Sequence, residues 1–216
     1  MTFVPDLPVL IAFTLAGAVL FATPGPDMSL WLARTLQGGR RAGLAAMAGT
    51  SAGCVVHSML AAFGISVLIT ASPLAFGALK AVGACYLLWL AWGAIRRGSV
   101  LPVAEVAGPA QPAPLWGGFL TGLMVNLANP KVVIFFLTFL PGFVSAGDPH
   151  AAGKLLFLGL WFVTLNLALG TLLILGADRV TGALRRRPGV LRAIDWSFAG
   201  VFGLFAVAIL RTQARG

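Results

Sequence analysis

Charged residues are scarce in this chain. Lys, Arg, Asp and Glu together make up 10% of the 216 residues, whereas a soluble domain usually carries about a quarter. Hydrophobic residues reach 59%, and the mean hydropathy is +0.95. The few charges cluster between long apolar runs, which excludes a soluble domain of ordinary composition. We therefore predict an all-α integral membrane protein embedded in a lipid bilayer.

Acidic residues and cysteines are also few. Six acidic against fifteen basic residues give a net charge of +9, which in a soluble protein would favour a nucleic-acid partner. In a membrane protein the same excess is expected from basic loops on one side of the bilayer, so no nucleic acid is predicted to bind. Cys54 and Cys85 both lie in apolar runs, which indicates packing rather than a disulfide or a metal site. No cofactor is predicted.

Six apolar segments are long enough, at about 20 residues or more, to cross a bilayer. They are Leu7–Ala33, Ala42–Thr70, Pro73–Ile95, Trp116–Leu140, Leu155–Ala177 and Val190–Leu210. A proline-rich stretch, residues 96–115, separates the third from the fourth. We therefore divide the chain into a three-helix repeat (1–95), a linker (96–115) and a second three-helix repeat (116–216). Because three is odd, two such repeats in series must have opposite orientations, as an inverted pair.

The basic residues predict the orientation in the membrane. Those on one side are Arg34, Arg40, Arg41, Arg96, Arg97, Arg179, Arg185, Arg186, Arg187 and Arg192. Those on the other side are Lys154, Arg211 and Arg215. The positive-inside rule then places the linker in the cytoplasm and both termini outside a bacterial inner membrane.

Prolines interrupt the first and the fourth segment. Pro24, Gly25 and Pro26 should open the first helix, because proline lacks a backbone donor and its ring presses on the preceding turn. Asp27 follows directly, at a depth where a charge is costly and marks a functional site. The polar residues of the second interruption, within "VNLANPKVV", are Asn126, Asn129, Pro130 and Lys131.

Interrupted helices at corresponding positions of two repeats indicate a transporter binding site. Each break presents a half-helix N-terminus, whose free N–H groups and partial positive charge favour a carboxylate. Asp27 can bind an ammonium group, and Asn126 and Asn129 can form hydrogen bonds. Such a site matches a small zwitterion. Two structural interpretations stay open: proline kinks without a ligand, and a buried ion pair between Asp27 and Lys131.

Other embedded polar residues have more than one interpretation. His57 and Asp27 are the candidates for carrying a coupling proton, since histidine changes charge near neutral pH. A neutral His57 could instead bond to a neighbouring helix. Gly49 and Gly53 have GxxxG spacing, which indicates close helix packing. Asn166 is expected to bond across helices rather than to contact substrate. The tryptophans mostly lie toward the segment ends, where they are typical interfacial anchors.

Three stretches carry a family resemblance: "PGPDMSLWLARTLQGGRRAGLAAMAGTSAG", "GALKAVGACYLLWLAWGAIR" and "NLANPKVVIFFLTFLPGFV". Together they resemble the lysine exporter family, LysE/RhtB, over nearly the whole chain except the linker and the tail. The resemblance implies export of amino acids or close derivatives from the bacterial cytoplasm, coupled to the proton gradient. Members differ among basic, branched-chain and sulfur-containing compounds, homoserine and threonine. By position it gives importance to Pro24, Gly25, Pro26, Asp27, Asn129, Pro130 and Lys131.

We therefore predict a secondary transporter, not an enzyme, that exports a small zwitterionic amino acid or derivative by proton antiport. A homodimer is compatible with this size. A cation or metal exporter on the same scaffold is disfavoured because the segments lack paired carboxylates or thiolates. A membrane-embedded enzyme is disfavoured because the embedded residues offer no Ser–His–Asp or metal triad. A scaffold that only assembles partners would need neither breaks nor embedded charges.

Overall fold

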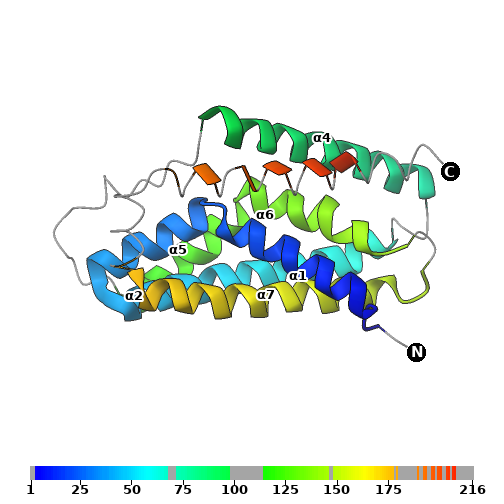
Figure 1. Cartoon of the computed structure of the whole chain (residues 1–216). Coiled ribbons are helices and arrows are strands. Elements are labelled where there is room, and N and C mark those ends of the chain that lie inside the picture. Colours follow the sequence, from blue (N-terminus) through cyan, green and yellow to red (C-terminus); the bar gives the residue numbers. More distant parts are fainter. Residues whose placement is uncertain are drawn as a thin grey trace.

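The computed structural model describes residues 3–67, 72–97, 114–145 and 148–177, with isolated positions between 179 and 207. Most of the predicted linker and of the predicted sixth helix lies outside these residues. Within the described ranges the chain forms helices and no β-strand (Figure 1). The elements are α1 (Leu7–Ala22), α2 (Pro26–Leu60), η1 (Ala61–Ile65), α4 (Pro73–Arg97), α5 (Leu115–Leu127), α6 (Pro130–Ile134), η3 (Phe135–Phe139), η4 (Leu140–Phe143) and α7 (Ala151–Leu175).

The chain reverses direction at Gly39, inside the element labelled α2. Gly39 has a φ of 77°, in the left-handed region that glycine adopts without a steric penalty. The indole Nε1 of Trp31 donates a hydrogen bond to Thr50 Oγ1 at 3.0 Å, across 19 residues of sequence. A straight helix would hold these residues about 28 Å apart. α2 is therefore a helical hairpin, and its turn falls between the predicted first and second segments.

Two helix interruptions lie where the prolines predicted them. α1 ends at Ala22 and α2 begins at Pro26, while α5 ends at Leu127 and α6 begins at Pro130. Each of these prolines stands at the start of its helix, where a missing N–H costs no hydrogen bond. The axis bends by 54° at the second break. Both predicted breaks are confirmed, and the helix after each of them begins with a proline, Pro26 or Pro130.

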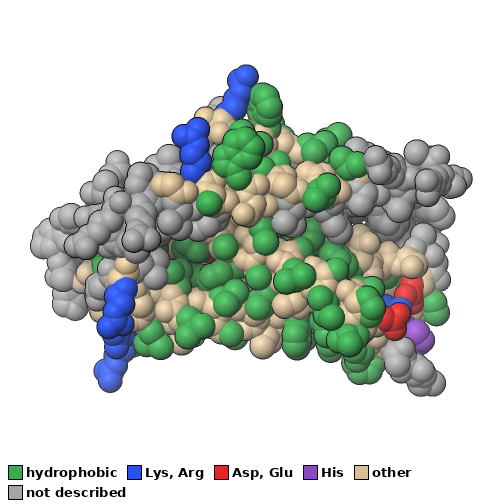
Figure 2. Space-filling model, in the orientation of Figure 1, with side chains coloured by type: hydrophobic (Ala, Val, Ile, Leu, Met, Phe, Trp, Pro, Cys, Tyr) green, Lys and Arg blue, Asp and Glu red, His purple; other side chains and the backbone are tan. Residues whose placement is uncertain are grey.

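The described surface is that of a membrane-embedded protein. Two of the described stretches contain a helix long and apolar enough to cross a membrane: Pro26–Ile65, which includes the hairpin of α2, and Ala151–Leu175. A third is added if α5 and the segment that follows it form one bent span. Large hydrophobic side chains such as Leu15 and Leu74 are 64% and 86% exposed. In Figure 2 hydrophobic side chains cover the middle of the visible face, while charged side chains lie toward its margins. Lipid, rather than water, is the solvent that such a surface fits.

Small residues bring α2 and α5 into close contact. A Cβ atom at Gly122 would overlap the backbone carbonyl of Ala46, and one at Gly49 would overlap the backbone of α5. Gly53 lies against the side chain of Asn126 in the same seam. The close packing predicted from the GxxxG spacing is therefore confirmed, and this seam places the residues before the second break beside α2.

An aromatic core supports the segment after the second break. Phe13 of α1 is fully buried, and its ring lies 6.0 Å from that of Phe135 in η3. The Phe135 ring is 4.5 Å from the ring of Phe162 in α7. These separations are typical of favourable aromatic pairs. The core holds α1, η3 and α7 together on one side of the two breaks.

Candidate functional site

Asp27 connects the two breaks. It lies in the first turn of α2, and its carboxylate accepts hydrogen bonds from two amides of the second break. Asn126 Nδ2 donates to Oδ2 at 2.7 Å, and Asn129 Nδ2 donates to Oδ1 at 3.0 Å. Both asparagines are buried, with exposed fractions of 0% and 2%. The amides fix the orientation of the carboxylate and stabilise its charge, while its remaining lone pairs can accept from a ligand.

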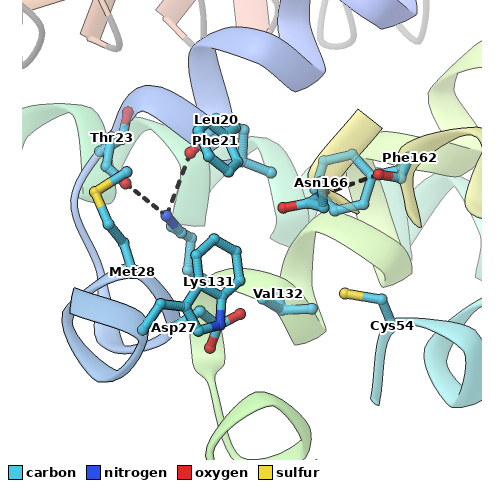
Figure 3. A pocket seen from close by; sticks show the side chains of 11 residues that line it. Leu20, Phe21, Thr23, Asp27, Met28, Cys54, Lys131, Val132, Phe162 and Asn166 are labelled. Atoms are coloured by element: carbon cyan, nitrogen blue, oxygen red, sulfur yellow. Dashed lines mark hydrogen bonds between the residues drawn. The ribbon is translucent and has the colours of Figure 1, made fainter. Parts of the chain in front are cut away.

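Lys131 binds backbone carbonyls rather than Asp27. Its Nζ donates to the carbonyl oxygen of Thr23 at 2.9 Å and to that of Leu20 at 3.3 Å (Figure 3). Carbonyls at a helix C-terminus lack an intrahelical partner and carry a partial negative charge, so an ammonium is favourable there. In the part of the chain that the structure describes, Lys131 forms no ion pair with a carboxylate. The interpretation of a buried Asp27–Lys131 ion pair is therefore wrong.

Asn129 also caps α6. Its Oδ1 accepts a hydrogen bond from the backbone N–H of Lys131 at 3.1 Å. Its backbone carbonyl accepts from Val132 and Val133, each at 3.0 Å. The first N–H groups of α6 are thus already occupied within the protein. Of the two half-helix N-termini proposed to receive a carboxylate, that of α6 therefore has its first N–H groups already bonded to Asn129.

A narrow cavity of about 30 Å³, partly open at its mouth, lies beside the two breaks. Its lining comes from α1, α2, α6 and α7, which meet around it in Figure 3. The lining residues are Leu20, Phe21, Thr23, Asp27, Met28, Trp31, Cys54, Lys131, Val132, Phe162 and Asn166. Asp27 and Lys131 therefore present one negative and one positive charge to the same narrow cavity.

The predicted site residues divide into two groups. Asp27 and Lys131 line the cavity, and Asn126 and Asn129 bond to Asp27. The remaining predicted residues shape the breaks and are not among the lining residues: Pro24, Gly25, Pro26 and Pro130. A Cβ atom at Gly25 would lie 3.1 Å from the Lys131 Nζ, so a glycine leaves room for that side chain.

His57 is not among the residues that line the cavity. It is buried, and its ring stacks on that of Phe136 with 5.5 Å between centroids and 23° between planes. The imidazole also faces the backbone of Asn126. Its Nε2 has no hydrogen-bond partner among the described residues. Because Asn126 also bonds to Asp27, His57 is one residue removed from the site carboxylate.

Two cavity residues have roles that the sequence did not predict. Among the described residues Asn166 forms no hydrogen bond to another helix; its Nδ2 donates to the Phe162 carbonyl of its own helix at 3.0 Å. The Asn166 oxygen points toward the cavity (Figure 3). Trp31 is no interfacial anchor, since it is 3% exposed and lines the cavity. The signal for Asn166 is a polar side chain within an apolar segment, which by itself marks a functional candidate.

Several efflux proteins are similar to this chain over most of their length. The homoserine/homoserine lactone efflux protein of Salmonella typhimurium is 28% identical over 204 residues, which cover 94% of this chain and 96% of the relative. The leucine efflux protein of Klebsiella pneumoniae is 27% identical over 201 residues, covering 93% and 94%. An uncharacterised membrane protein of Pseudomonas aeruginosa is 30% identical over 205 residues, covering 93% and 94%. No solved structure matches significantly.

The family model described as LysE type translocator matches residues 18–213. The match includes both breaks, the hairpin of α2 and the cavity. With nearly the whole sequence covered, this chain belongs to the LysE type translocator family.

Proposed function

We propose that this protein is a secondary transporter that exports an amino acid or an amino-acid derivative from the bacterial cytoplasm by proton antiport. One observation carries the proposal: two helix breaks, far apart in sequence, bring a carboxylate and an ammonium to one cavity. The family is one of translocators rather than enzymes, and two relatives are named efflux proteins for homoserine or its lactone and for leucine. Those names support a substrate with an α-amino group.

The two cavity charges each keep capacity for one end of a zwitterion. The Asp27 carboxylate accepts two amides and has lone pairs left for the substrate ammonium. The Lys131 ammonium has three N–H groups and uses two of them on Thr23 and Leu20. The third can donate to the substrate carboxylate, which the positive end of α2 also favours. Because Asp27 and Lys131 form no direct ion pair with each other among the described residues, no such pair has to be broken before binding.

Competition for Asp27 would couple export to protons. A protonated Asp27 has no charge to hold the substrate ammonium, so one carboxylate cannot bind the proton and the amino acid together. Exchange of the two between opposite faces of the membrane is antiport. His57 is the second proton-carrying candidate, since it contacts the backbone of Asn126, which bonds to Asp27.

The proposed architecture has six membrane spans in two inverted three-helix repeats, 1–95 and 116–216, joined by a cytoplasmic linker, 96–115. Both termini lie on the outer face of the inner membrane, opposite to the linker. This architecture is compatible with a homodimer. The likeness of the breaks supports the repeat. In each, a helix ends and the next begins with a proline at its first position, Pro26 or Pro130.

Asp27→Asn tests the proposal. In vesicles containing the purified protein, the variant should exchange amino acids at least about tenfold more slowly, because the amide cannot form a charge-assisted bond to the ammonium. Asp6→Asn is the matched control, since Asp6 is exposed ahead of α1. A thermal unfolding curve for each variant separates folding from transport. Full exchange by Asp27→Asn would remove Asp27 from the binding role.

Proton coupling requires its own measurement. Vesicles that hold a pH-sensitive dye should show proton movement opposite to the amino acid, and Asp27→Asn should abolish it. Amino-acid movement with no change of internal pH would refute antiport while leaving amino-acid export in place.

A further inference from the structure

Among the described residues, one carboxylate and one ammonium line the cavity. Besides Asp27 and Lys131, the lining residues are uncharged. Six of them are apolar and large, from α1, α2, α6 and α7: Leu20, Phe21, Met28, Trp31, Val132 and Phe162. The others are Thr23, Cys54 and Asn166. Thr23 is already bonded to the Val19 carbonyl through its hydroxyl, at 3.0 Å.

An α-amino acid uses both cavity charges for its own ammonium and carboxylate. A further charge on its side chain would then face apolar groups without a partner of opposite sign. Burying an unpaired charge is strongly unfavourable, whereas burying an apolar side chain against the same wall is favourable. The lining therefore discriminates among amino acids by the charge of their side chains.

On the basis of the proposed function, we propose that the substrate is a neutral amino acid with an apolar side chain, such as leucine or methionine, and that basic and acidic amino acids are excluded. The side-chain subsite is the apolar wall with Asn166 as its uncharged polar member. Asn166 holds its amide nitrogen on Phe162 and directs its oxygen into the cavity (Figure 3). A charge introduced at this position would change which side chains the wall accepts.

A panel of amino acids tests the specificity of the unmodified protein. Purified full-length protein in vesicles, preloaded with each unlabelled compound, is supplied with the same compound in labelled form. Leucine and methionine should exchange at least about a hundredfold faster than lysine or glutamate. Two results would overturn the inference and leave the proposed function intact. In the first, lysine or glutamate exchanges as fast as leucine; in the second, homoserine exchanges faster than leucine. If no amino acid exchanges, the proposed function fails, and the inference fails with it.

Asn166→Asp tests where the substrate side chain lies. The replacement has nearly the same shape and adds a carboxylate to the apolar wall. The exchange of lysine relative to leucine should rise at least about tenfold, because the lysine ammonium gains a partner. Thr164→Ser is the control, on the same helix but exposed, with its hydroxyl bonded to Leu160. An unchanged ratio of lysine to leucine exchange in a folded Asn166→Asp protein would overturn the placement of the subsite. If this variant does not fold, the panel of amino acids still decides the substrate class.

Discussion

The ammonium of Lys131 lies 2.9 Å from the backbone carbonyl oxygen of Thr23, so the second break caps the helix that ends at the first. The same ammonium donates to Leu20, one turn earlier in α1. Lys131 lies in the first turn of α6, which Asn129 caps, and the Asn129 amide also donates to Asp27. The Lys131 ammonium and the Asn129 amide thus connect α1, α2 and α6 at one point. Binding at the cavity and the integrity of both breaks depend on the same residues.

Lys131→Met should impair both stability and transport. The variant leaves the Thr23 and Leu20 carbonyls without their donor, which should cost about 2 kcal/mol in the free energy of unfolding. It also removes the partner proposed for the substrate carboxylate, so exchange should fall at least about tenfold. Thermal unfolding and vesicle exchange measure the two effects.

Lys154→Met is the matched control for that variant. Lys154 pairs with Asp148 near the start of α7, at a partly exposed position. It should change stability by less than about 1 kcal/mol and leave exchange unaltered. Normal exchange by Lys131→Met would show that Lys131 is only a helix cap.

The breaks themselves could be predicted because proline acts locally. Its ring and its missing N–H interrupt a helix whatever surrounds it, and the polar residues beside Pro26 and Pro130 mark the interruptions as buried in protein. The breaks required no knowledge of how the helices pack. The hydrogen bonds of Asn126 and Asn129 to Asp27 were not predicted, because the pattern marks these residues as polar but does not show which of them meet.

The partner of Lys131 could not be predicted, because it is a backbone group. A sequence shows the charge of Asp27 but not which helix end points at a side chain, and here carbonyls of α1 bind the ammonium instead. The prediction that Trp31 is an interfacial anchor is wrong for a similar reason. The preference of tryptophan for interfaces is an average over positions, and the reversal at Gly39 turns this indole toward Thr50 in the interior.

Substitutions at Asn129 should separate its two roles. Asn129→Ala loses the cap of α6 and the donor to Asp27, so the free energy of unfolding should fall by about 1 kcal/mol and exchange should also fall. Asn129→Ser retains a capping oxygen but has too short a side chain to reproduce the amide. We expect it to recover most of the stability and little of the exchange, measured as above. Recovery of both would mean that capping is the only role.

Gly122→Ala should separate α2 from α5. The added methyl group would overlap the Ala46 carbonyl, which is backbone and cannot turn aside. We expect a loss of about 1–3 kcal/mol in the free energy of unfolding. Gly117→Ala on the same helix is the control, because nothing lies within 4 Å of its Cβ position. The control should be neutral or more stable by up to about 1 kcal/mol, as alanine is the better helix former. Equal effects at both sites would contradict the close contact.

The carboxyl of Asp148 should make the free energy of unfolding depend on pH in the acidic range, without affecting transport. A hydrogen bond from Lys154 at 2.6 Å, and then one from the His150 N–H at 2.8 Å, lower the pKa of its carboxyl. Because the folded pKa lies below the unfolded value of about 4, the stabilisation is complete above that value. It is lost as the pH falls through the folded pKa. Asp148→Asn should therefore be less stable than the unmodified protein at pH 7, by at most about 1 kcal/mol, with the difference shrinking below about pH 4. Thermal unfolding at several pH values measures it, and a difference that grows on acidification would contradict the lowered pKa.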